Sequence, residues 1–135
     1  RQTDAALLVN FGGDLAANGP RHDGTPWRVG IETAQAAHSG TPLTAAPLIR
    51  LHRGGVATSG DARRHVLHEG VRYGHVLDAR SGWPVPNAPH SVTVAGDTCV
   101  AAGSLATLAL LSGADAEQFL QAQATDFHVL RDRSP

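Results

Sequence analysis

The period of the hydrophobic pattern changes near Thr98, and this change restricts the possible folds more than any other feature of the chain. Before it, residues 27–32 and 91–95 alternate apolar and polar side chains, which is the period of half-buried strands. After it, three leucines recur at three-residue spacing, as on one face of a helix: Leu105, Leu108 and Leu111. Strands therefore come first and helices late, rather than in regular alternation.

Local signals give the second half of the chain its boundaries. Gly113 stands where a glycine commonly ends a helix, and residues 114–123 predict a second short helix with acidic residues in its first turn. Residues 127–130 predict a closing strand. We therefore predict an α+β fold, with a mixed or largely antiparallel sheet and two short helices near the C-terminus.

The first strand is predicted at residues 5–10, an apolar run that ends at Gly12 and Gly13 and has the composition of a buried strand entering a tight turn. Segments rich in glycine, proline and short polar residues predict loops at 16–26, 33–47 and 81–89. The last of these has three prolines, so it cannot be a central strand.

The middle of the chain predicts further strands. Residues 48–58 contain two strand pieces, and Gly54 with Gly55 predicts a bulge or turn between them. Residues 64–74 predict a hairpin, because two apolar runs flank the pair Glu69 and Gly70.

Composition bounds the kind of molecule. A chain of 135 residues is at most one domain, and the absence of methionine favours a mature or cut segment. A net charge of -1 supplies no field for nucleic acid or an anionic membrane surface. No apolar run approaches the roughly 20 residues of a membrane span. The lone Cys99 cannot form an internal disulfide and is expected to be a small core residue.

Two glycine-containing polar clusters are candidates for binding. Asn10, Gly12, Gly13 and Asp14 follow a strand, and their backbone N–H groups could approach a phosphate or a planar ring closely, although a plain turn has the same composition. Residues 58–61 (Thr-Ser-Gly-Asp) offer two hydroxyls beside a flexible glycine. This second cluster could hold pyrophosphate oxygens or a flavin edge, or form an ordinary turn.

His75 and Asp78 are candidates for acid–base chemistry. Side chains three apart on a strand point to opposite faces, so the two converge only if the chain turns, as residues 79–82 predict. A histidine oriented by a carboxylate is a usable general base. The other seven histidines are interpreted as surface or packing residues.

As an ordered set these motifs resemble the C-terminal half of the FAD:protein FMN transferases, the ApbE-like family. The chain has NFGGD, WRVGIE, VATSGD, HVLDARSG and SVTVAG, followed by a helix containing LAT. The usual family forms are N-x-GGD, W-x-VGI, ATSGD, H-[IV]-[IL]-D-P-x-T-G and a final helix with A-D-A-L-A-T. The resemblance covers nearly the whole chain in the same order.

The resemblance implies transfer of the FMN half of FAD to a serine or threonine hydroxyl of an acceptor flavoprotein, with magnesium assisting and AMP released. The resemblance makes His75 the candidate for the base, with Asp78 as its neighbour in the motif. The resemblance also implies eight FAD-binding candidates, which are Asn10, Gly12, Gly13, Asp14, Thr58, Ser59, Gly60 and His75. Thr107 is the metal-ligand candidate, and the family's N-terminal half would be a required partner. Residues 1–135 would then be one segment of a transferase domain, in a family with both exported and cytoplasmic members.

One departure from the family pattern leaves alternatives open. The family's metal-binding aspartate lies four residues before the threonine, and Gly103 occupies that position here. Mg²⁺ prefers carboxylate oxygens, which glycine does not supply. The alternatives to an active transferase are a degenerate homologue that binds FAD without transferring it and a structural half-domain.

Overall fold

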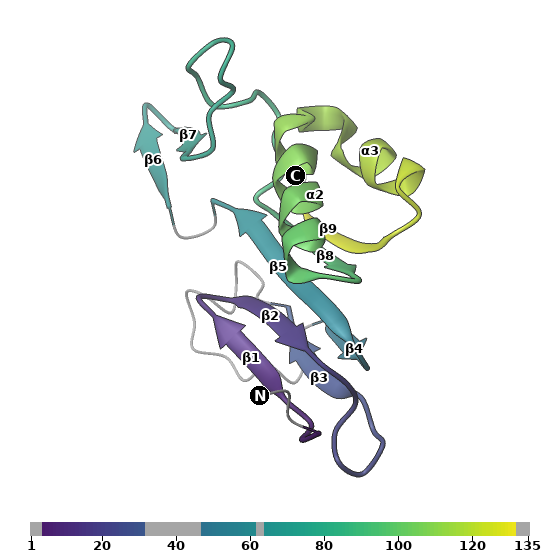
Figure 1. The fold of residues 1–135 in the computed structure, drawn as a ribbon. Helices are drawn as coiled ribbons and strands as arrows, with labels where there is room; N and C mark the ends of the chain where they lie inside the picture. The colour runs from purple at the N-terminus through teal and green to yellow at the C-terminus, as the bar shows by residue number, and fades with distance from the viewer. Residues whose placement is uncertain (1–3, 32–46, 62–63, 132–135) are drawn as a thin grey trace.

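The computed structural model describes residues 4–31, 47–61 and 64–131 of the chain. Its centre is a five-stranded antiparallel sheet in the order β1-β2-β5-β8-β9, with two helices over one face (Figure 1). The strands of this sheet are β1 (Leu8–Phe11), β2 (Asp14–Ala17), β5 (Gly54–Gly60), β8 (Ser91–Gly96) and β9 (Asp126–Leu130). Two separate antiparallel pairs complete the described part: β3 (Trp27–Gly30) with β4 (Leu48–Leu51), and β6 (His65–His68) with β7 (Val71–Gly74). The predicted α+β class is confirmed, and every described strand pair is antiparallel.

Helix α2 (Cys99–Leu111) begins and ends where local sequence signals predict. The Thr98 side chain accepts a hydrogen bond from the Ala101 N–H, which caps the first turn. Gly113 has φ of 60° and begins a short 3-10 turn, η2 (Gly113–Asp115), before helix α3 (Ala116–Ala122). The two predicted late helices are confirmed, with α3 shorter than expected.

The helix face of the sheet holds the larger core. Small residues of α2 pack against valines of β8 and against Ala57 of β5, while Leu120 of α3 is fully buried. Because side chains alternate along β5, the residue before Ala57, Val56, points to the opposite face of the sheet. There it packs in a second cluster with Ala17, Val29 and Leu51, so the β3–β4 pair covers part of that face.

Two predictions about the first strands are wrong. The segment at 5–10 is not a buried strand: β1 lies at the edge of the sheet, and Val9 is 57% exposed. The predicted loop at 16–26 begins too early, because Ala16 and Ala17 belong to β2. The loop predicted at 33–47 lies almost entirely outside the described residues.

The predictions for the glycines of β5 are also wrong. Gly54 and Gly55 do not separate two strand pieces but belong to β5, and the chain turns before them, at His52 and Arg53. Thr58, Ser59 and Gly60 likewise form the end of β5 rather than a turn, since Thr58 pairs with Thr93 and Gly60 with Ser91. The register with β8 is what identifies these residues as strand.

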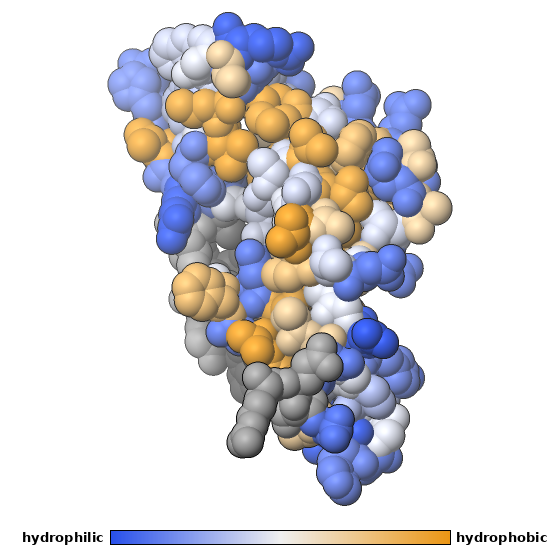
Figure 2. All heavy atoms as spheres, in the orientation of Figure 1, coloured by the Kyte–Doolittle hydropathy of each residue, from blue (hydrophilic) through white to orange (hydrophobic). Residues whose placement is uncertain are grey.

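The predicted β6–β7 hairpin is confirmed. Glu69 and Gly70 both have positive φ, 49° and 76°, which suits the two-residue turn of a twisted hairpin. Val66, Leu67 and Val71 are more than half exposed on it, and Figure 2 shows apolar side chains over the upper part of the molecule, where the hairpin and α2 lie. Among the described residues no helix is long and apolar enough to cross a membrane.

Candidate functional site

The predicted binding residues meet at one cavity of about 660 Å³. Its volume falls in the range of small-molecule sites, about 300–1,000 Å³. Seven of the eight predicted FAD-binding residues line it: Asn10, Gly12, Gly13, Thr58, Ser59, Gly60 and His75. The eighth, Asp14, lies beside it, because its carboxylate accepts a hydrogen bond of 3.4 Å from the Thr58 N–H. The three separate motifs are therefore neighbours in space.

The β1–β2 turn supplies the first wall. Asn10 Oδ1 accepts a hydrogen bond of 3.0 Å from the Gly13 N–H, which closes the turn. Gly12 and Gly13 have φ of 67° and 107°, values that residues with a side chain rarely adopt. No atom of residues 4–31, 47–61 or 64–131, the glycines and their chain neighbours aside, lies within 4 Å of the place where a Cβ would stand on either glycine, so a ligand can approach this backbone closely.

The edge of β5 beyond its pairing with β2 supplies the second wall. Pairing of β2 with β5 stops at Val56, so the residues beyond it present an edge not covered by β2. The Thr58 N–H points to this edge, since it donates to Asp14, and the alternation of a strand directs the Gly60 N–H to the same side. Such backbone donors suit anionic oxygens.

The hydroxyls of this strand point to opposite faces of the sheet. Thr58 Oγ1 lies 2.8 Å from Thr93 Oγ1 on the face away from α2. Ser59 Oγ lies 3.0 Å from Thr107 Oγ1 of α2. Thr93 and Ser91 also line the cavity, and sequence analysis missed them. The signal was present, because hydroxyl residues alternate with valines in SVTVA and a two-residue period puts them on one face.

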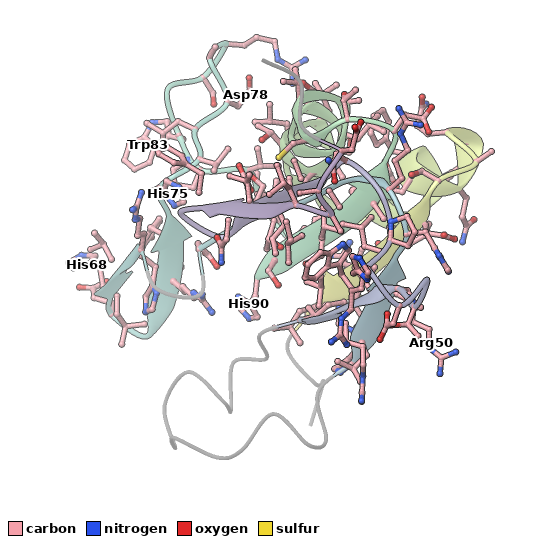
Figure 3. All side chains as sticks on the ribbon, turned by 60° about the horizontal axis from the view of Figure 1, so that its bottom comes forward. Arg50, His68, His75, Asp78, Trp83 and His90 are labelled. Atoms are coloured by element: carbon pink, nitrogen blue, oxygen red, sulfur yellow. The ribbon has the colours of Figure 1, made fainter. Side chains whose placement is uncertain are left out.

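His75 follows β7 and lines the cavity from the side of the hairpin (Figure 3). Its Nδ1 lies 3.2 Å from the carbonyl oxygen of Arg64. A carbonyl only accepts, so the hydrogen is assigned to Nδ1, and Nε2 keeps its lone pair. The imidazole therefore has the tautomer that a general base needs.

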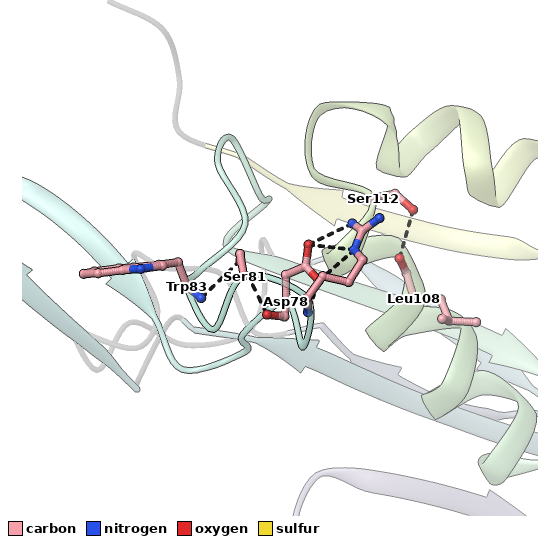
Figure 4. Close-up of polar contacts among 6 residues, drawn as sticks. Asp78, Ser81, Trp83, Leu108 and Ser112 are labelled. Carbon is pink, nitrogen blue, oxygen red and sulfur yellow. Dashed lines mark hydrogen bonds and ion pairs between the residues drawn. The ribbon is translucent and has the colours of Figure 1, made fainter.

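Asp78 does not meet His75. The turn predicted after it is confirmed, since the N–H groups of Ser81 and Gly82 donate to the Asp78 carbonyl. Its carboxylate, however, binds Arg80 through Nε at 3.0 Å and Nη2 at 2.8 Å (Figure 4). These bonds lower the pKa of Asp78 to about 2. Asp78 is therefore an ionised residue paired with Arg80, and Arg64 is the residue that holds the His75 ring.

The donors around Thr107 do not fit a magnesium ion. Its hydroxyl is in a hydrogen bond with Ser59, and a Cβ on Gly103, one helical turn earlier, would meet only Ala57 Cβ at 3.6 Å. Within residues 4–31, 47–61 and 64–131, no three His, Cys, Asp or Glu side chains group as metal ligands. Magnesium prefers carboxylate oxygens, so these residues alone do not form its site.

Cys99 opens helix α2 and packs against the core on the helix face of the sheet. Burial raises the pKa of its thiol, and the charge of Asp14 raises it further. A thiol with a raised pKa is a poor nucleophile at neutral pH, so Cys99 fits the expected role of a small core residue.

Comparison with known proteins gives one consistent result. The family model described as ApbE family matches residues 2–130. An FAD:protein FMN transferase of Vibrio cholerae is 35% identical over 106 residues, which cover 78% of this chain and 30% of the relative. The Haemophilus influenzae protein of the same name is 32% identical over 108 residues, covering 80% of this chain and 30% of the relative.

Solved structures agree with this match. The apo form of the Pseudomonas stutzeri flavinyl transferase ApbE superposes with a TM-score of 0.77 at 30% identity, covering 96% of this chain and 39% of that one. The apbe protein of Thermotoga maritima gives 0.74 at 28% identity, covering 92% and 39%. The chain spans about a third of the length of the relatives that it matches.

Proposed function

The chain belongs to the ApbE family, and from this premise we propose that it supplies the C-terminal part of the active site of an FAD:protein FMN transferase. In this proposal residues 1–135 are one segment of the transferase domain. The rest of the domain, FAD and an acceptor flavoprotein are its partners. The protein that contains the chain transfers FMN from FAD to a serine or threonine hydroxyl of the acceptor.

The observation that carries this proposal is the convergence of three distant motifs on one cavity. Asn10, Gly12 and Gly13 come from the first hairpin, Thr58 to Gly60 from the end of β5, and His75 from the segment after β7. Backbone N–H groups and hydroxyls at this cavity suit the anionic oxygens of a pyrophosphate.

The reaction needs a base near the attacking hydroxyl. An oxygen of the acceptor forms a bond to the phosphorus of the FMN half of FAD, and the bond from that phosphorus to the bridging oxygen breaks. The hydroxyl proton passes to His75 Nε2, the unprotonated nitrogen in the assigned tautomer. AMP leaves with the bridging oxygen. Positioning and charge stabilisation carry most of the catalysis in such phosphoryl transfers.

The test uses the intact protein with FAD, Mg²⁺ and an acceptor protein. We expect a fluorescent flavin band on the acceptor in a denaturing gel, and AMP in equal amount. His75→Gln should lower the rate by about 10²–10⁴-fold, the usual contribution of a general base. His68→Gln is the matched control, because His68 lies on the exposed hairpin and does not line the cavity. Equal rates for His75→Gln and the wild type would remove His75 from the mechanism.

A second candidate function is FAD binding without transfer, and Gly103 favours it. Helix α2 has no carboxylate one turn before Thr107. The Thr107 hydroxyl is instead in a hydrogen bond with Ser59. This candidate is supported if the wild-type protein binds FAD in calorimetry but releases no AMP. A protein that binds neither FAD nor Mg²⁺ would instead be a structural homologue.

Gly103→Asp separates the two candidate functions, flavin transfer and FAD binding without transfer. A side chain fits at this position, because its Cβ would make only ordinary contact with Ala57. If the missing carboxylate is the cause of inactivity, Gly103→Asp should create Mg²⁺ binding and Mg²⁺-dependent AMP release. Gly103→Asn has nearly the same shape without the charge and should do neither. Full transfer activity in the wild type would end this second candidate.

A further inference from the structure

We propose that Arg72 is a positioning residue for the transfer reaction: together with Asp61 and His90 it holds the β6–β7 hairpin, and thereby His75, against the sheet. The inference rests on the proposed function, because it takes His75 as the base. Asp61 and Arg72 lie outside the set of residues proposed to bind FAD or to react.

The three side chains form a closed group from three parts of the chain. Arg72 of β7 donates from Nη2 to Asp61 Oδ1 at 2.5 Å, and its Nη1 lies 3.3 Å from His90 Nε2. His90 Nδ1 lies 3.5 Å from the same Asp61 oxygen. The exposed fractions of the side chains are only 23% for Arg72, 17% for Asp61 and 12% for His90. Charged groups with so little access to water interact more strongly than a surface pair.

The guanidinium of Arg72 determines the tautomer of His90. Arginine only donates hydrogen bonds, so His90 Nε2 must accept, and its hydrogen lies on Nδ1 facing Asp61. One negative and one positive charge then remain, and they compensate each other. These three contacts form only when β7 stands next to the end of β5 and the start of β8.

Asp61 contacts both strands of the hairpin. Its backbone carbonyl accepts a hydrogen bond of 3.1 Å from the Arg64 N–H. The same oxygen lies 3.0 Å from Nδ1 of His65, the first residue of β6. Its carboxylate binds Arg72, the second residue of β7. A Cβ on Gly74 would stand 2.8 Å from Asp61 Oδ2, so the chain passes directly over this carboxylate just before His75.

Apolar packing does not hold the hairpin in place of these polar contacts. A cavity of about 480 Å³ lies beside β7, lined by Val71 to Gly74 on one side and by residues 84–90 on the other. In the part of the chain that the structure describes, β6 and β7 pair only with each other. An isolated two-stranded hairpin is marginally stable, so its position depends on the contacts at Asp61.

Losing Arg72 should therefore displace His75 without removing any group from the cavity. Arg72 does not line the cavity that contains His75. A misplacement of about 1 Å can cost about 10²-fold in rate. Binding of FAD by the two other motifs is expected to persist.

The test compares Arg72→Gln with Arg131→Gln in the intact protein. Arg131 makes a similar bidentate pair, with Glu117 at 2.7 and 2.6 Å, but lies at the end of β9 next to α3. We expect Arg72→Gln to lower kcat by about 10–100-fold while KM for FAD changes less than about twofold. Arg131→Gln should leave both constants unchanged. Asp61→Asn added to Arg72→Gln should cost little more, because the two residues act through one contact.

Hydrogen exchange measured by mass spectrometry supplies the second readout. In Arg72→Gln, peptides covering residues 64–76 should exchange about tenfold faster or more, while those of β5, β8 and α2 stay protected. Unchanged kcat with unchanged exchange would overturn the proposal. So would a rise in exchange spread over the whole sheet, since that reports global stability.

Failure of the proposed function would look different. If the wild-type protein transfers no flavin, the proposed function fails, and exchange alone decides whether Arg72 positions the hairpin. A rise confined to residues 64–76 then supports the positioning role, and its absence refutes it.

Discussion

Replacing Gly55 with alanine should push helix α2 away from strand β5. A Cβ on Gly55 would stand 2.3 Å from the Cys99 nitrogen and 2.4 Å from its Cα, whereas ordinary contact begins at 3.4 Å. Both atoms belong to the helix backbone, which cannot rotate aside as a side chain can. The first turn of α2 must therefore retreat by about 1 Å, and overpacking of this kind costs about 1–3 kcal/mol.

Gly103→Ala is the matched control for this prediction. It adds the same methyl group at the same interface of α2 and β5, but there the new Cβ meets Ala57 Cβ at 3.6 Å, an ordinary contact. Within a helix, alanine is also favoured over glycine by about 1 kcal/mol. We therefore expect Gly103→Ala to be neutral or stabilising.

The assay is urea and thermal unfolding of the intact protein. A loss of 1 kcal/mol lowers Tm by about 2–4 °C in a domain of about 150–250 residues, so Gly55→Ala should lower it by about 2–12 °C. A retreat of α2 should also lengthen the 3.0 Å bond between Ser59 and Thr107. Equal stability of Gly55→Ala and the wild type, or an equal loss in Gly103→Ala, would refute the steric argument.

Three further predictions concern local features. Thr98→Ala removes the side-chain cap of α2 and should cost about 1 kcal/mol in urea unfolding, whereas Thr98→Ser should restore most of it. Glu69→Asn should stabilise by about 0.5–1 kcal/mol, because asparagine tolerates φ of 49° in this turn better than glutamate; a lower urea midpoint would contradict this. Arg131 lowers the pKa of Glu117 from its ordinary value of 4.5, so the stability from this pair is complete above that pH and is lost as the pH falls below it. Unfolding midpoints measured between about pH 6 and pH 3 should therefore converge for the wild type and Arg131→Gln, and parallel curves would contradict the assignment.

Sequence alone determined those features that depend on neighbouring residues. The start of α2 at Thr98, its end near Gly113 and the turn at Glu69 and Gly70 were all predicted in place. Capping and positive φ are properties of a few consecutive residues, so the signal is local. The family was also evident, because several short motifs occur in a fixed order.

Tertiary structure decided which residues are paired and buried. Glycine within a strand looks like a break, so only pairing with β8 showed that Gly55 and Gly60 belong to β5. An apolar run does not reveal whether it lies in the centre or at the edge of a sheet, which is why β1 was expected to be buried. Side-chain partners are equally non-local: the carboxylate of Asp78 binds Arg80 and not His75. Register and strand order bring Asn10, Thr58 and His75 to one cavity, and these long-range contacts are not encoded in any single segment.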